Sequence, residues 1–382
     1  MNTRTILDRL LAFETVSRDP NMALIQYVEQ LLKSKGIAST IIATPDGKKA
    51  NLFATVGPQD KPGVMLSGHT DVVPVDGQNW SVEPFALTEK DGRIYGRGAA
   101  DMKGFVASAI ATCLKASQLD LKTPLHLALS HDEEIGCIGV RSLIDHMKQA
   151  PQRPLMCIVG EPTDMSVATG HKGKAALRAR CSGRAAHSAL APNGVNAIYL
   201  AADFVSALRE LQTEFQSVGA KDTDYDVPYT TLHVGQIEGG VALNIVPDSA
   251  SVLFEFRNLA EDNPVPLLAR LRSMADNVAQ SFGDPDAHIE IEEVFAYPGL
   301  ATPPTARIIA FVQSLLGSNG TIKVAFGTEG GLFDQVLGIP TCICGPGSME
   351  QGHKPDEFVT VDQLDRCDAM LSRLIEHLEA GL

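Results

Sequence analysis

The chain of 382 residues is long enough for two or three domains, and its 44% of hydrophobic residues is ample for a buried core. Its 46 acidic residues outnumber its 32 basic ones, and the net charge of −14 argues against nucleic acid or an anionic membrane as a partner. No apolar run approaches the roughly 18 residues of a membrane span. The seven scattered cysteines suit a reducing compartment, so we expect a cytoplasmic protein.

The order of strand and helix patterns predicts an α/β protein with an inserted domain. Residues 1–13 read as an amphipathic helix without the apolar stretch of a signal peptide. Strands and helices then alternate to about residue 174. The following segment predicts the strand-helix-strand-strand-helix-strand order of a split βαβ (ferredoxin-like) domain, with elements at 175–181, 196–211, 229–238, 251–257, 264–282 and 288–294. We therefore expect a catalytic domain with a mixed sheet over 1–174 and 295–382, and an inserted domain over 175–294.

The first polar cluster follows the apolar run at residues 63–67, which predicts a buried strand. His69 and Asp71 stand at its carboxyl end, where open α/β sheets place their ligands. An imidazole can bind a metal through one nitrogen while a carboxylate accepts the proton on the other. We predict that His69 is a ligand and that Asp71 orients it, although the His-x-Asp pattern by itself also fits a solvated loop histidine.

Two further clusters supply acidic side chains. A glycine-rich loop carries Asp101 ahead of a small-residue helix expected from about residue 105 to 115, where an aspartate can also serve as a simple N-cap. A predicted strand at 125–130 is followed by three consecutive acids that include Glu133 and Glu134. Such neighbours repel one another unless a cation lies among them. An exposed acidic turn is the alternative.

Two more segments complete the set of metal-binding side chains. A predicted strand at 155–159 precedes Glu161, and His353 lies far along the chain in the segment 352–358. Donors of the types His, Asp, Glu, Glu and His at successive strand ends are the ligand chemistry of a dinuclear zinc centre. The sequence therefore predicts a two-metal hydrolytic site.

On these motifs the chain resembles, over essentially its whole length, the co-catalytic zinc family that contains aminoacylases, carboxypeptidase G, succinyl-diaminopimelate desuccinylase and acetylornithine deacetylase. The resemblance implies two zinc ions per subunit, with cobalt as a substitute. It implies that His69 binds one ion, that Asp101 bridges both, that Glu161 completes the first site, and that Glu134 and His353 complete the second. Glu133 would be the general acid and base.

The resemblance also assigns residues of the inserted domain, which would act as a lid and join a homodimer. His187 would reach the active site of the partner subunit and donate a hydrogen bond to the substrate carbonyl oxygen. A loop histidine that caps a helix is the alternative. Asn244 and Arg257 resemble substrate contacts, and the guanidinium of Arg257 suits a bidentate grip on a carboxylate.

The carboxyl-terminal pattern, at 327–331 and 345–358, is most similar to the acetylornithine deacetylase branch. It implies release of acetate from N2-acetyl-ornithine in arginine biosynthesis, with Thr328 and Glu329 as further substrate contacts. Succinyl-diaminopimelate desuccinylation, deacylation of another N-acyl amino acid and dipeptide cleavage remain alternatives that need the same metals. An inactive metal-binding dimeric scaffold is the alternative outside enzymes, and the intact Glu133 speaks against it.

Overall fold

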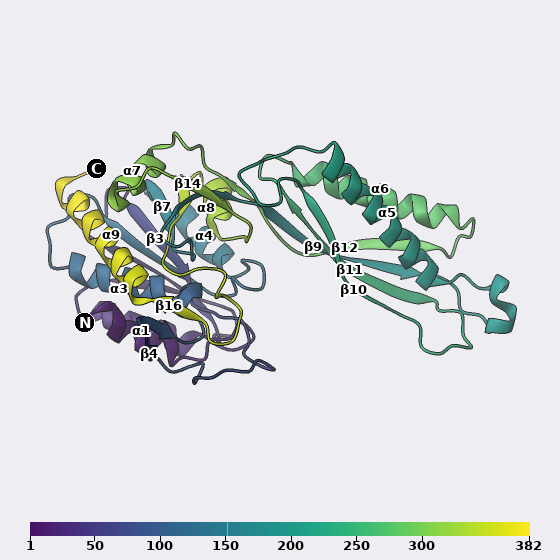
Figure 1. Ribbon diagram of the computed structural model, residues 1–382, viewed down its shortest axis with the longest axis horizontal. Helices are drawn as coiled ribbons and strands as arrows, with labels where there is room; N and C mark the ends of the chain where they lie inside the picture. Colours follow the sequence, from purple (N-terminus) through teal and green to yellow (C-terminus); the bar gives the residue numbers. More distant parts are fainter. Residues whose placement is uncertain (151) are drawn as a thin grey trace. The chain divides into compact units, whose positions relative to one another are not determined.

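The computed structural model describes residues 1–150 and 152–382, which divide into two compact units (Figure 1). The first unit comprises Met1–Gly170, Leu300–Val324 and Thr328–Leu382, and the second comprises His171–Gly299 and Ala325–Gly327. Within these described ranges, every helix is too short or too polar to cross a lipid bilayer.

A nine-stranded mixed sheet forms the centre of the first unit. Its order is β1 (Ser39–Ala43), β2 (Ala50–Val56), β6 (Leu125–Ser130), β3 (Val64–His69), β7 (Met156–Val159), β15 (Thr341–Ile343), β8 (Val167–His171) and β13 (Leu300–Ala301), and β14 (Thr321–Val324) pairs with β8. The strands β6, β3, β7 and β15 run parallel, whereas β1, β2 and β8 pair antiparallel with their neighbours. The predicted mixed sheet flanked by helices is thus confirmed. A small separate sheet contains β4 (Thr88–Lys90), β5 (Arg93–Tyr95) and β16 (Phe358–Thr360).

Seven α-helices accompany this sheet in the described part of the first unit. They are α1 (Thr3–Leu11), α2 (Met22–Lys33), α3 (Gly104–Ala116), α4 (Val140–Gln149), α7 (Arg307–Leu316), α8 (Gly330–Leu337) and α9 (Val361–Ala380). Five of them, α1, α2, α3, α7 and α9, share one continuous buried core with the sheet, and α4 contacts α8. Small side chains allow α3 to be buried on almost every side. The side chains of Asn2 and Thr360 cap the amino ends of α1 and α9.

The second unit has the predicted split βαβ order. It contains β9 (Gly173–Ser182), a 3₁₀ turn η2 (Ser188–Asn193), α5 (Ala197–Ser217), β10 (Thr231–Gly239), β11 (Ser249–Asn258), α6 (Pro264–Ser281) and β12 (His288–Tyr297). Its four strands are antiparallel in the order β10, β11, β9, β12. Burial alternates along β11, and the inward Phe254 ring lies 5.5 Å from that of Phe204 on α5. Helices α5 and α6 therefore cover one face of this sheet (Figure 1).

The sheet of the first unit brings polar strand ends together. Because β6, β3 and β7 are parallel neighbours, the residues that follow them meet at one edge of the sheet. His69 ends β3 and lies beside Ser130, the last residue of β6. The end of β7 comes close to α3 because Gly160 has no side chain: a Cβ there would lie 1.9 Å from the ring of Phe105. This edge is where the candidate site forms.

Candidate metal centre

The five predicted ligands come from separate elements of the first unit and lie together. His69 ends β3, Glu134 lies in the turn after β6, and Glu161 follows β7. Asp101 lies in the turn η1 (Ala99–Lys103), directly before α3, and its own φ of −120° and ψ of 91° are not helical. His353 lies in the loop between β15 and β16.

Asp101 occupies the middle of this group. Its Oδ1 is 3.0 Å from Nε2 of His69, and its Oδ2 is 3.2 Å from Nε2 of His353. On one side, Oε1 of Glu161 is 3.6 Å from the same nitrogen of His69. On the other side, Oε2 of Glu134 is 3.0 Å from that of His353. Two sets of three donors therefore share one carboxylate, which is an arrangement that suits two adjacent metal ions.

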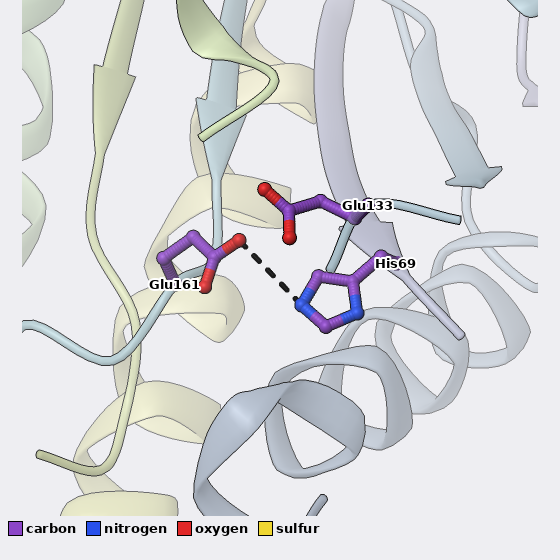
Figure 2. Close-up of side chains that lie close together, drawn as sticks. All are labelled: His69, Glu133 and Glu161. Atoms are coloured by element: carbon purple, nitrogen blue, oxygen red, sulfur yellow. Dashed lines mark ion pairs between the residues drawn. The ribbon is translucent and has the colours of Figure 1, made fainter. Parts of the chain in front are cut away.

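Glu133 lies inside the same cluster. Ligand atoms of His69, Glu133 and Glu161 all fall within 4.8 Å of one another, as do those of His69, Asp101 and Glu134. Figure 2 shows the Glu133 carboxylate beside Glu161 and the His69 ring. The thiol of Cys137 donates to Oε1 of Glu133 at 3.3 Å. By position, Glu133 can therefore act as a base next to the ions or as an additional ligand.

Asp71 contacts its neighbours through both its main-chain carbonyl and its carboxylate. The main-chain carbonyl of Asp71 lies 2.9 Å from Nδ1 of His69, whereas the nearer carboxylate oxygen is 3.7 Å away. The carboxylate instead accepts the backbone N–H groups of Glu133 and Glu134 at 3.1 and 3.4 Å and the hydroxyl of Ser17 at 2.6 Å. The sequence predicted that this carboxylate orients His69, but the structure gives that part to the carbonyl. In both cases Nδ1 of His69 carries the proton. Nε2 is therefore the ring nitrogen that can bind a metal, and it faces the carboxylates of Asp101 and Glu161.

The turn that carries the two glutamates is also held from outside. Lys49 donates to Oδ1 of Asp132 at 2.6 Å and to the carbonyl of Ser17, and His131 Nδ1 lies 3.1 Å from the other oxygen of Asp132. Sequence analysis did not single out Lys49 or Ser17, because each acts on a residue that is distant in the chain.

The electrostatics of the cluster favour a cation. Burial raises the pKa of Glu134 to about 7, with a contribution from Asp101, and it raises the pKa values of Glu133 and Glu161 well above their usual range. Burial also opposes ionisation of Asp101, but hydrogen bonds from His353 and His69 lower its pKa below the ordinary value. Carboxylates with this much mutual repulsion, lying between two imidazoles, fit divalent metal ions.

The two predicted substrate contacts at the start of α8 are buried. The carboxylate of Glu329 is 1% exposed and accepts the hydroxyl of Ser67 at 3.4 Å. Burial raises the pKa of Glu329 to about 7. The hydroxyl of Thr328 accepts the backbone N–H of Gly330 at 3.0 Å, at the amino end of α8.

In the second unit, His187 and Asn244 lie at one end of the sheet. Nδ1 of His187 accepts the backbone N–H of Ala189 at 3.1 Å, so its Nε2 carries the proton of the neutral ring. The ring thereby caps η2, as the alternative for this histidine anticipated, and keeps an exposed donor. The carbonyl of Asn244 accepts the N–H of Ser188 at 3.0 Å, and Ile245 pairs with His187 in an isolated bridge.

Arg257 lies at the other end of the same sheet. It pairs with Lys174 on β9, whereas Ser249, at the start of β11, pairs with Ser182. These two pairs lie eight positions apart along the extended strand, which corresponds to about 26 Å. The Nε of Arg257 donates to Oε1 of Glu255 at 2.9 Å. The structure therefore brings His187 and Asn244 together but keeps Arg257 of the same unit away from them.

Comparison with known proteins gives a consistent result. The sequence pattern of peptidase family M20/M25/M40 matches residues 65–377. Acetylornithine deacetylase of Pasteurella multocida is 33% identical over 380 residues, which are 97% of this chain and 97% of that protein. An M20-family metallo-carboxypeptidase from Sulfolobus solfataricus has a similar fold, with a TM-score of 0.79 and 19% identity over all of both chains. A dinuclear metal binding M20 peptidase from Bacillus subtilis has a TM-score of 0.70 and 16% identity over 100% of this chain and 98% of that one.

The raised pKa values predict how pH affects stability. Glu134 and Glu329 have pKa values of about 7 in the folded metal-free protein, so between pH 5 and about 7 the folded state holds protons that the unfolded state has released. His353, with its pKa raised to about 10 by hydrogen bonds with Asp101 and Glu134, acts in the same direction above pH 6.5. The melting temperature of metal-free protein should therefore fall from pH 5 to 8.

The measurement is a thermal melt at each pH with and without added Zn²⁺. The stabilisation by Zn²⁺ should increase with pH, because metal displaces protons from the same groups. Glu134→Gln should flatten the slope of the metal-free protein. A metal-free melting temperature that rises over this pH range would contradict the electrostatic interpretation.

Proposed function

The chain belongs to peptidase family M20/M25/M40, and from that premise we propose that this metal-dependent hydrolase removes the acetyl group of N2-acetyl-L-ornithine. The products would be ornithine and acetate, as in arginine biosynthesis. The observation that supports hydrolysis most directly is Asp101, whose two oxygens face the imidazoles of His69 and His353. The substrate assignment is supported by the relatives named acetylornithine deacetylase, which match nearly the full chain.

We assign two zinc ions per subunit, with cobalt as a substitute. His69, Asp101 and Glu161 would hold the first ion, and Asp101, Glu134 and His353 would hold the second. The dinuclear metal binding of the Bacillus subtilis protein of similar fold supports the number. When bound, such a pair polarises an amide carbonyl and lowers the pKa of water.

The proton transfers fall to Glu133. Its carboxylate would take a proton from the attacking water as the oxygen bonds to the carbonyl carbon, and return it to the amine nitrogen as the C–N bond breaks. Burial and the neighbouring Glu134 raise the pKa of Glu133, so its carboxylate is a stronger base than that of an exposed glutamate. Asp71 fixes the position of this base through the backbone N–H of Glu133.

We further propose that His187 stabilises the carbonyl oxygen from the partner subunit of a homodimer. The exposed Nε2–H of His187 is a suitable donor. Arg257, our candidate for the substrate carboxylate, lies about 26 Å along the sheet from the end that carries His187. A molecule the size of acetylornithine cannot span that distance. If both residues contact one substrate, they must therefore belong to different subunits.

The second unit also has the surface that such a dimer needs. Several large apolar side chains are exposed at its η2 end and along β10: Leu190, Tyr199, Ile237, Val241 and Leu243. Leu243 is fully exposed, and β10 is an edge strand of the four-stranded sheet. We accordingly propose residues 175–294 as a lid and dimerisation domain and residues 1–174 and 295–382 as the catalytic domain. The buried, free cysteines support a cytoplasmic location.

Other deacylase activities use the same centre. A desuccinylase, another N-acyl-amino-acid deacylase or a dipeptidase would differ in the residues that contact the substrate side chain and acyl group. An inactive scaffold would not need Glu133 beside His69 and Glu161 (Figure 2). The four variants below, together with a panel of substrates, separate these cases.

Glu133→Gln and Glu134→Gln should have different effects. Glu133→Gln removes the proton carrier but no assigned ligand, so kcat should fall by about 10²–10⁴-fold while both metals are retained. Glu134→Gln should lower metal content. Metal analysis of dialysed protein together with kcat decides between them. If Glu133→Gln loses an ion and Glu134→Gln keeps two, the roles of the two residues are reversed.

Mixing two inactive variants tests the composite site. His187→Ala and Glu133→Gln protein should each be nearly inactive, and the mixture should regain activity because a heterodimer contains one site with both groups intact. Activity should follow the heterodimer fraction during subunit exchange. A fully active monomer in sedimentation experiments would rule out the role of His187 in trans.

Substitution of Glu329 tests how the enzyme selects its substrate. We propose that its carboxylate pairs with the side-chain ammonium of ornithine, a charge-assisted hydrogen bond worth about 1–3 kcal/mol. Wild type should prefer acetylornithine to acetylnorvaline, acetylmethionine, succinyl-diaminopimelate and a dipeptide in kcat/KM. Glu329→Gln should reduce kcat/KM for acetylornithine more than for acetylnorvaline, which lacks the amine. Equal losses would instead support the alternative that the buried Glu329 positions neighbours such as Ser67.

A further inference from the structure

A buried ion pair beside the metal centre holds the backbone of Asp101. Oε1 of Glu357 accepts the N–H groups of Gly98, Ala100 and Asp101 at 3.1, 2.9 and 3.0 Å. Its other oxygen accepts Nη1 of Arg97 at 2.6 Å. Both side chains of the pair are 1% exposed. Glu357 therefore fixes the turn from which the shared carboxylate projects.

The same arginine fixes the side chain of Gln78. Nη2 of Arg97 donates to Oε1 of Gln78 at 2.5 Å, and Nε1 of Trp80 donates to the same oxygen at 3.0 Å. The guanidinium of Arg97 also lies 5.0 Å from the centre of the Trp80 ring. Because two N–H donors meet this atom of the Gln78 amide, the atom must be the oxygen. The NH₂ group of Gln78 is therefore on the opposite side of the amide.

That NH₂ group binds the residue that carries the second-site imidazole. Nε2 of Gln78 donates to the main-chain carbonyl of His353 at 2.9 Å. The side chain of His353 is 45% exposed, and its φ of 63° lies in the left-handed region, so neither burial nor regular structure holds this loop residue. Nearby, the carboxylate of Asp356 accepts the N–H and hydroxyl of Ser81, both at 2.8 Å.

We propose that Gln78 is a positioning residue that sets the affinity of the second metal site. It connects two of the three ligands of that site: it reaches the turn of Asp101 through Arg97 and Glu357, and the loop of His353 through the main-chain carbonyl. The first-site ligands His69 and Glu161 are fixed instead by the ends of β3 and β7. The proposal rests on the ligand assignment made under the proposed function.

The test measures metal binding rather than activity. Gln78→Glu keeps an acceptor for Arg97 and Trp80 but loses the donor to the His353 carbonyl, and Gln78→Leu loses all three bonds. Gln59→Leu is the matched control, because the amide of Gln59 also donates to a backbone carbonyl, that of Gly57 at 3.2 Å, on an exposed surface. Metal-depleted full-length protein is titrated with Zn²⁺, and bound zinc is counted after dialysis.

Wild type and Gln59→Leu should each bind two ions per subunit. Gln78→Glu should bind the first ion with unchanged affinity and the second about 10–100-fold more weakly, the usual effect of removing a partner behind a ligand. Excess Zn²⁺ should restore kcat of this variant. Gln78→Leu should lower the affinity of the second site for Zn²⁺ at least as much. If Gln78→Leu does not fold, the zinc affinity of Gln78→Glu alone tests the proposal.

Two results would overturn the proposal. Wild-type affinity for both ions in Gln78→Glu would show that the His353 contact is dispensable. Equal weakening of both ions would show that Gln78 supports the whole centre. The variant His353→Ala separates these results from a failure of the proposed function, and it should bind one ion. If wild type binds fewer than two ions, or if His353→Ala still binds two, the ligand assignment itself is wrong.

Discussion

The mutual repulsion of buried carboxylates is the interaction on which the rest of this structure depends. Asp101 and Glu161 are buried, and Glu133 and Glu134 are partly buried beside them in one small volume. In the metal-free protein, protonated histidines and raised carboxyl pKa values relieve that repulsion only in part. A pair of divalent ions would relieve it more fully. The surrounding fold is what keeps these groups from separating: β3, β6 and β7 carry them, and Asp71 and Glu357 hold the adjacent turns.

Much of this arrangement could be predicted from the sequence because it depends on local pattern. An apolar run followed by a polar residue marks a parallel strand and its carboxyl end, so His69, Glu134 and Glu161 could be placed at one edge of the sheet without coordinates. Asp101 and His353 were harder, since each lies in a loop. Their assignment came from the family resemblance. In the structure, Oδ2 of Asp101 lies 3.2 Å from Nε2 of His353.

The parts that the sequence did not predict are contacts between distant segments. Glu357 binds the turn of Asp101 across 256 positions, and Gln78 binds the loop of His353 across 275. Neither the hydrophobic periodicity nor the motif spacing of a sequence indicates a hydrogen bond between such distant segments. Asp71 shows a second limit, because its main-chain carbonyl, rather than the predicted carboxylate, is the closer partner of His69. A residue type can indicate a role while a different atom of that residue performs it.

The two halves of the centre therefore differ in how they are held. His69 is 1% exposed and belongs to a strand paired on both sides, so its position follows from the sheet. His353 is half exposed and depends on a few side-chain hydrogen bonds that reach it from Gln78 and, through Asp356, from Ser81. A ligand fixed by a sheet loses little entropy on binding metal, whereas a loop ligand loses more unless other contacts have already ordered it. The Gln78 network supplies that ordering at the site where the sheet cannot.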